Sequence, residues 1–153
     1  MTAPPAILDD PSFPPDAARF LVEAGLPLSC TPYLSFEELQ DGPPSLVQHY
    51  GAHQLHPDDQ SRLEPFYVIG SDSAGNPLCV DSARDGEVVM LDHEDGFRTQ
   101  VFVASSVAAL AEALLLVHTV PYEDFVEHLR ACDPPAARNS AFLPREVAML
   151  IED

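Results

Sequence analysis

The chain has 153 residues, of which 46% are apolar and 21% charged, a composition typical of one globular domain. It carries 25 acidic residues against 7 basic ones, all of them Arg, for a formal net charge of -18. A surface this negative disfavours direct binding to nucleic acid or to an anionic membrane, and it favours a basic protein partner. The alternative is that the acidity serves solubility alone.

We expect the protein to be cytoplasmic. The N-terminal residues show neither the positively charged segment nor the long apolar run of a signal peptide. The most apolar stretch, Ala108 to Val117, is too short to span a bilayer.

The first third of the chain predicts little regular structure. Residues 1–15 are rich in Pro and are expected to form an irregular segment that precedes a single domain over residues 16–153. Asp16 is a candidate N-cap for a helix that ends at Gly25. The following residues hold two prolines, which allow at most a short edge strand, and Ser35 with Glu38 has the form of a capping box. Residues 45–64 are polar and fit either a short helix or a mobile loop.

The middle of the chain alternates apolar runs with turn formers. The predicted strands are Phe66–Ile69, Leu78–Val80, Glu87–Asp92 and Gln100–Val103, and the residues between them are dense in Asp, Gly, Asn and Ser. Short strands at this spacing are typical of an antiparallel meander.

The C-terminal third is predicted to be helical. Ser106 can cap a helix over residues 106–118, with an apolar stripe at the helical spacing. A second helix is expected between Pro121 and Pro134, and a third is expected to begin at Pro144. The fold class is therefore α+β, a single domain with a twisted antiparallel sheet flanked by helices and no second core.

No specific catalytic motif is present, and we predict no catalytic residue, metal or cofactor. His49, His53 and His56 have a spacing that would share a helix face and hold a metal, but Pro57 follows directly and a polar loop or surface helix fits as well. Asp92 to Asp95 fits a solvated hairpin tip better than an acid–base site. Asp72, Asp81 and Asp85 lack the spacing of a calcium loop.

Four segments, in the same order along the chain, resemble the SUKH superfamily (SMI1/KNR4-like), in particular its SUKH-4 immunity proteins. The first is Phe20–Pro27, and the second is Tyr67–Asp81, an apolar strand ending in Ile-Gly, an acidic turn and a strand ending in Asp. The third runs from Gly86 to Glu94 and the fourth from Phe102 to Leu115. The sequence departs from the pattern after Ser106, where the helix is rich in Ala and Leu instead of aromatic residues.

The resemblance implies a bacterial cytosolic antidote that binds and blocks a secreted polymorphic toxin, without catalysis. Many such toxins act on nucleic acids and are basic, which suits an acidic partner. The candidate partner-binding residues are acids on turns and strand ends: Asp72, Asp81, Asp85, Glu87, Asp92, Glu94 and Asp95, with Glu37, Glu38 and Asp41 as a second patch.

Two alternatives stay open from the sequence. One is a regulatory or scaffold module of the same fold with an endogenous partner, and the other is a hydrolase with a scattered Asp and His site. The oligomeric state is not predicted.

Overall fold

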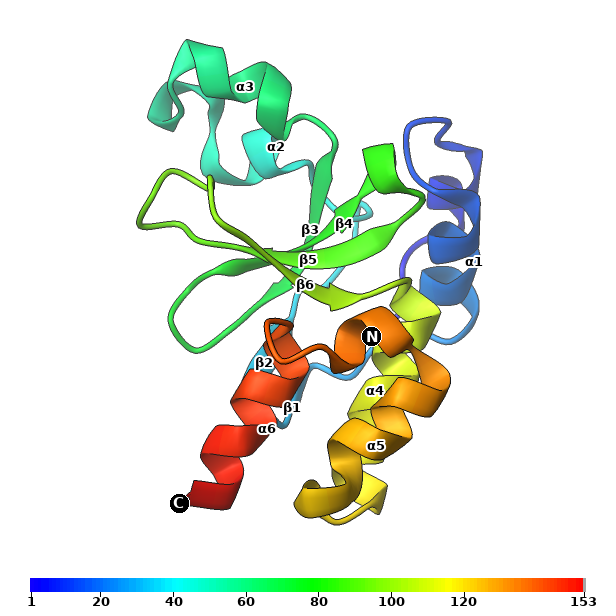
Figure 1. The fold of residues 1–153 in the computed structure, drawn as a ribbon. Coiled ribbons are helices and arrows are strands. Elements are labelled where there is room, and N and C mark those ends of the chain that lie inside the picture. Colours follow the sequence, from blue (N-terminus) through cyan, green and yellow to red (C-terminus); the bar gives the residue numbers. More distant parts are fainter. Residues whose placement is uncertain (153) are drawn as a thin grey trace.

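The computed structural model describes residues 1–152, and a six-stranded antiparallel sheet lies at its centre (Figure 1). The spatial order of the strands equals their order in the chain, which confirms the predicted α+β meander. The strands are β1 (Ser29–Cys30), β2 (Leu34–Phe36), β3 (Phe66–Ser71), β4 (Pro77–Asp81), β5 (Glu87–Leu91) and β6 (Gln100–Ala104).

The four strands predicted in the middle of the chain are present as β3 to β6, each within a few residues of its expected bounds. The region before them differs from the prediction. Residues 26–36 form two short strands instead of at most one, and the expected helical turn at Ser35 is wrong. Ser35 and Phe36 belong to β2, and the N–H of Glu37 donates to the carbonyl oxygen of Ile69 on β3 at 3.0 Å. Residues 35–37 are held extended by this pairing with β3, so no helical turn begins at Ser35.

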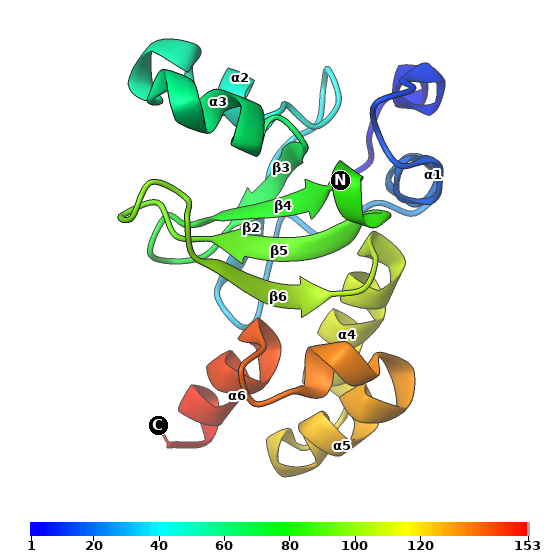
Figure 2. The same cartoon turned by 45° about the horizontal axis from the view of Figure 1, so that its top comes forward.

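Three of the four longer helices lie together on one side of the sheet, as Figures 1 and 2 show: α4 (Val107–Thr119), α5 (Tyr122–Cys132) and α6 (Phe142–Glu152). The fourth, α1 (Pro15–Glu23), lies beside the end of the strands and packs into the same hydrophobic cluster. All four were predicted. Asp16 lies inside the first turn of α1 instead of capping it, and α6 begins two residues before Pro144. The hydroxyl of Ser106 accepts from the N–H of Ala109 at 3.0 Å and caps α4 as expected.

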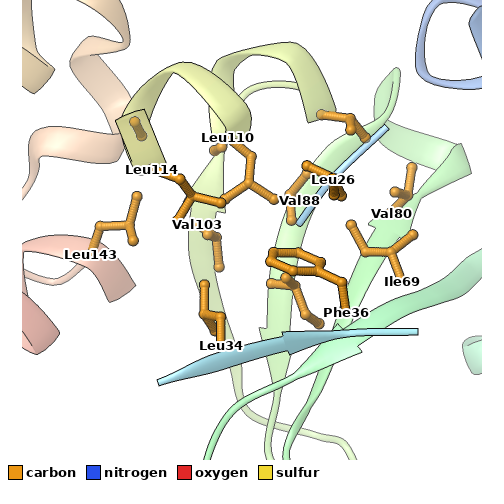
Figure 3. Packing of buried hydrophobic residues seen from close by; sticks show 14 of the residues in the cluster. Leu26, Leu34, Phe36, Ile69, Val80, Val88, Val103, Leu110, Leu114 and Leu143 are labelled. Carbon is orange, nitrogen blue, oxygen red and sulfur yellow. The ribbon is translucent and has the colours of Figure 1, made fainter. Parts of the chain in front are cut away.

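These helices and the sheet enclose the larger of two hydrophobic clusters (Figure 3). Figure 3 shows Leu110 and Leu114 of α4 directed toward Val103 and Val88 of the sheet, with Phe36 of β2 beside them. All of these side chains are at most 6% exposed. Burial on this scale supplies most of the driving force for folding.

The opposite face of the sheet is also covered, so the expectation of a single core is wrong. Residues 45–64, which the sequence left open, form α2 (Leu46–Tyr50), the 3-10 helix η2 (Ala52–Gln54) and α3 (Pro57–Leu63). Ser45 and Gln48 form a capping box at the start of α2. Beneath these elements lies a smaller cluster made of Leu46, Leu63, Phe66, Val68, Cys79, Val89, Leu91 and Phe97.

The Pro-rich N-terminal segment contains one 3-10 helix, η1 (Pro5–Asp9), and no other helix or strand up to Pro14. Its apolar side chains pack into the larger cluster, where Ile7 and Phe13 are buried. The N–H of Ala3 donates to the carbonyl oxygen of Leu21 on α1 at 2.8 Å. These contacts place the segment along α1 and beside the end of the sheet, where it forms one wall of the site described next.

Candidate partner-binding site

A polar groove of about 690 Å³ opens between the N-terminal segment, the loop before α2 and the start of β3. Three of its lining residues carry a carboxylate, and none carries a basic side chain. The lining residues are Asp10, Ser12, Asp41, Gly42, Pro43, Pro44, Ser45, Gln48, Glu64, Pro65, Tyr67 and Ser82. The groove is therefore suited to a cationic or hydrogen-bonding group.

One wall of the groove is held by a chain of hydrogen bonds. The hydroxyl groups of Ser12 and Tyr67 lie 2.7 Å apart, and Ser12 Oγ donates to Asp10 Oδ1 at 2.6 Å. The ring of Phe13 packs edge-on against the ring of Tyr67, with centroids 5.2 Å apart. The side-chain hydrogen bond from Ser12, and then its backbone N–H, lower the pKa of Asp10. Asp10 therefore keeps its negative charge in the groove.

A second hollow of about 390 Å³ adjoins the first and shares Ser12 and Ser82 with it. It adds the carboxylates of Asp16 and Asp85. Close approach at this point depends on Gly86, where a Cβ atom would lie 3.3 Å from Pro14 and where φ is +84°. We call the two hollows together the acidic groove, defined by Asp10, Asp16, Asp41, Glu64 and Asp85.

Few cations neutralise the carboxylates. Within residues 1–152 the ion pairs are Arg62 with Asp59, at 3.1 Å, and His56 with Asp58, at 3.5 Å, the latter charged only when His56 is protonated. Asp10 accepts hydrogen bonds from Ser12, and neither ion pair involves any of the five acids of the acidic groove, so a cation brought by another molecule meets no competing Arg or His in these pairs.

The structure brings only two of the ten predicted partner-binding residues into the acidic groove, Asp41 and Asp85. Asp81 is 4% exposed and its Oδ1 accepts from the N–H of Ala83 at 3.0 Å, so it holds the turn after β4. Glu38 lines a separate small hollow next to Leu28. Glu37 and Glu87 are half-buried, and Glu94 is exposed.

Three other predicted acids accept hydrogen bonds within their own turns. Asp72 Oδ1 accepts from the N–H groups of Ala74 and Asn76, both at 2.9 Å. Asp92 Oδ1 accepts from the N–H of Glu94 at 2.8 Å, and Asp95 accepts from Arg98 and Thr99. These bonds stabilise the turns after β3 and β5. For Asp92 to Asp95, they are typical of the hairpin tip that the sequence favoured over an acid–base site.

Sequence reasoning missed Asp10, Ser12, Asp16, Glu64 and Tyr67. The DDPSFPPD stretch signals turns and negative charge, but nothing in it predicts contact with a tyrosine 55 positions later. No local pattern encodes such a long-range contact.

The three histidines considered for a metal lie on separate elements. His49 is in α2, His53 is in η2, and His56 caps α3, where its Nδ1 accepts from the N–H of Asp58 at 3.2 Å. They do not share the face of one helix. Over residues 1–152, no group of three or more His, Cys, Asp or Glu side chains is arranged to hold a metal ion. In the same residues, no helix combines the length and apolarity needed to cross a membrane.

The comparisons with known proteins agree with the resemblance seen in the sequence. The family model described as SUKH-4 immunity protein matches residues 1–143, from the N-terminal segment into the start of α6. No curated protein and no solved structure matches the chain. Because the family match covers nearly the whole chain and the fold is the expected α+β meander, the chain belongs to the SUKH-4 immunity protein family.

Proposed function

We propose that this chain is a cytoplasmic immunity protein that neutralises a basic, nucleic-acid-targeting toxin domain by binding it, without catalysis. Membership of the family implies immunity to a toxin. The observation that supports a basic partner is the acidic groove, which gathers five carboxylates from five separate segments and has no basic side chain in its lining.

The toxin proposed as the partner acts on nucleic acid and must therefore bind it. A protein that binds nucleic acid presents Arg and Lys to phosphates. An Arg guanidinium suits a groove that offers carboxylates and hydroxyl groups, since its planar fork forms two charge-assisted hydrogen bonds at once. Asp10, with its lowered pKa, and the neighbouring Tyr67 hydroxyl supply such acceptors. Occupying the toxin's cationic surface would exclude its substrate.

The net charge of -18 acts at longer range. Opposite charges on two proteins steer their encounter and raise the association rate, which falls again as salt screens the field. An immunity protein benefits from fast capture, because the toxin must be bound before it acts. The predicted acids outside the groove, such as Asp72, Glu87 and Glu94, contribute mainly to this field.

The test is co-expression with the toxin domain encoded beside this gene, scored first by cell survival and then by co-purification. The triple variant Asp41→Asn, Glu64→Gln, Asp85→Asn should weaken binding at least tenfold and lower the association rate. The control is Glu123→Gln, Asp124→Asn, Glu127→Gln on α5, which removes the same charge from exposed positions.

Two outcomes would contradict the proposal. If the wild-type chain neither protects cells nor binds the toxin domain, the function is wrong. If the two triple variants lose the same affinity, net charge alone matters and the acidic groove is not the contact.

A further inference from the structure

The strand β1 forms an edge of the sheet, and its first residue, Ser29, has backbone groups that do not pair with β2. The register pairs Ser29 with Ser35 and Cys30 with Leu34, and the N–H of Phe36 donates to the carbonyl oxygen of Leu28 at 2.8 Å. Hydrogen-bonded pairs alternate along an antiparallel ladder. The pair at Ser29 is therefore a non-bonded one, and the N–H and carbonyl of Ser29 point away from β2.

The pairing of β2 with β3 independently indicates that the backbone groups of Ser29 point away from β2. Glu37 donates its N–H to Ile69, and the register pairs Ser35 with Ser71. Alternation then directs the backbone groups of Ser35 toward β3, leaving none for Ser29. Ser29 is itself exposed to solvent. Free backbone groups at a sheet edge, here the N–H and carbonyl of Ser29, can pair with a further strand.

Two hollows flank this edge, and both include Ser29 and Cys30. The first, of about 440 Å³, is almost wholly apolar and lies between β1, the end of α1 and α4, with Leu114 and Leu115 in its lining. The second, of about 510 Å³, lies toward the β3–β4 turn and includes Tyr33 and Ser73. A strand laid along β1 would send successive side chains to opposite faces, so that each hollow could receive one.

Two exposed side chains at these hollows have the character of interface anchors. Leu115 is 65% exposed and Tyr33 is 63% exposed. Tyr33 also has φ of +62°, a left-handed conformation that a tyrosine seldom adopts. Such conformations gather at functional positions, and Tyr is enriched among residues that dominate binding.

Charge decides which occupant fits. A second copy of this chain could pair through β1, but it would bring together two chains of net charge -18. A cationic partner meets attraction instead. Because Pro27 and Pro32 flank β1 and keep it short, few backbone bonds are available. At this edge, therefore, an apolar side chain in the hollow beside Leu114 must contribute more to binding than the backbone bonds do.

We propose that β1 receives an extended segment of the cationic toxin, which adds a strand to the sheet and places an apolar side chain in the hollow between α1, β1 and α4. This mode of docking is strand addition with side-chain pockets supplying specificity. It rests on the proposed function, but it uses a surface that shares no lining residue with the acidic groove.

The experiment measures binding of the toxin domain encoded beside this gene to matched variants. Ser29→Pro removes the outward N–H while leaving the ladder to β2 intact, and Ser29→Ala retains that N–H. We expect Ser29→Pro to weaken binding at least tenfold and Ser29→Ala to change it less than about twofold. Leu115→Glu should weaken binding similarly, whereas Leu8→Glu, at a site 51% exposed on η1, should not.

The outcomes separate this proposal from the function itself. If the wild-type chain does not bind the toxin domain, both the proposed function and the proposed role of β1 are wrong. If the wild type binds and both Ser29→Pro and Leu115→Glu bind equally well, the role of β1 alone is wrong. A wild-type dimer that Ser29→Pro converts to a monomer, with toxin binding unchanged, would show that a second copy occupies β1 and would also overturn the proposal.

A thermal unfolding midpoint for each variant confirms that it is folded. Should Ser29→Pro fail to fold, amide hydrogen exchange on the wild-type chain replaces it. Slower exchange at Ser29 when the toxin domain is bound supports the added strand, and unchanged exchange there refutes it.

Discussion

The two faces of the sheet are covered in different ways. On one face, α1, α4, α5 and α6, of 9 to 13 residues each, bury the larger cluster. On the other, α2 and α3, of five and seven residues, cover the smaller cluster with help from η2 and the loop after β5. Helices this short have little stability of their own.

On the face covered by α2 and α3, which we call the thin face, hydrogen bonds hold the short helices in place. Ser45 and Gln48 cap α2 reciprocally, and Arg62 of α3 donates to the carbonyl oxygens of Gly96 and Phe97 at 3.0 and 2.8 Å. Phe97 takes φ of +63° to place its ring against Tyr50, with centroids 4.8 Å apart. One face is thus stabilised by apolar area and the other by specific local bonds, so the second should open first.

The largest effect is expected on the well-covered face. Phe125 of α5 is fully buried in the larger cluster. Phe125→Ala should lower the free energy of unfolding by about 3–5 kcal/mol, because it removes apolar contacts and leaves a cavity. Urea unfolding measures the loss, and Glu127→Ala on the exposed side of α5 is the control, with a change below about 0.5 kcal/mol. A loss under 1 kcal/mol for Phe125→Ala would erase the contrast between the faces.

The corresponding change on the thin face is Leu63→Ala. Leu63 is fully buried at the end of α3 and belongs to the smaller cluster. We expect a loss of about 2 kcal/mol, at the low end for Leu→Ala, since a short helix can shift into the space. Amide hydrogen exchange should quicken over residues 46–64 while β4 and β5 stay protected. An equal loss of protection in all three regions would mean that the two faces unfold as one unit.

The contrast between the faces also explains what the sequence could predict. The strands β3 to β6 and the helices α4 and α5 carry strong local signals, apolar runs between turn formers and a stripe through Leu110, Leu114 and Val117. The sequence also carries a signal for the second cluster. Every residue of β4 is buried, and an unbroken apolar run such as Leu78 to Val80 is typical of a strand covered on both faces.

The acidic groove could not be assembled from the sequence for a different reason. Its acids come from the N-terminal segment, α1, the loop before α2, the end of α3 and the β4–β5 turn. Of these, the sequence predicts only Asp41 and Asp85 as partner-binding residues, because they lie on recognisable turns. The joining contact, Ser12 with Tyr67, spans 55 positions and depends on packing of Phe13 that no short motif specifies.

Removing the hydrogen bonds of Arg62 from the thin face should lower the free energy of unfolding by an intermediate amount. Arg62→Met keeps the length of the side chain but deletes the donors to Gly96, Phe97 and Asp59. A loss of about 1–2 kcal/mol is expected, because two carbonyl oxygens lose a charged donor. Arg98→Met removes the same charge from an exposed position and is the control. If both variants unfold at the same urea concentration, the thin face does not depend on these hydrogen bonds.

The smallest effect concerns a carboxylate on the well-covered side, Glu146 of α6. Partial burial, and then the negative charge of Asp72, raise the pKa of Glu146, and Arg145 offsets this only in part. The folded state therefore holds the proton more tightly than the unfolded state, and stability falls as the pH rises through the raised pKa. Glu146→Gln removes this penalty.

We accordingly expect Glu146→Gln to raise the free energy of unfolding at pH 7 by less than about 1 kcal/mol, because solvent still screens the group, and to raise the thermal midpoint slightly. The gain should fade below the usual range of a glutamate, near pH 4, where both chains are neutral at this position. Glu127→Gln removes the same charge from an exposed position on α5 and is the control. A gain that persists unchanged at low pH would point to better packing by the amide. The charge of Glu146 would then not be what destabilises the folded state at α6.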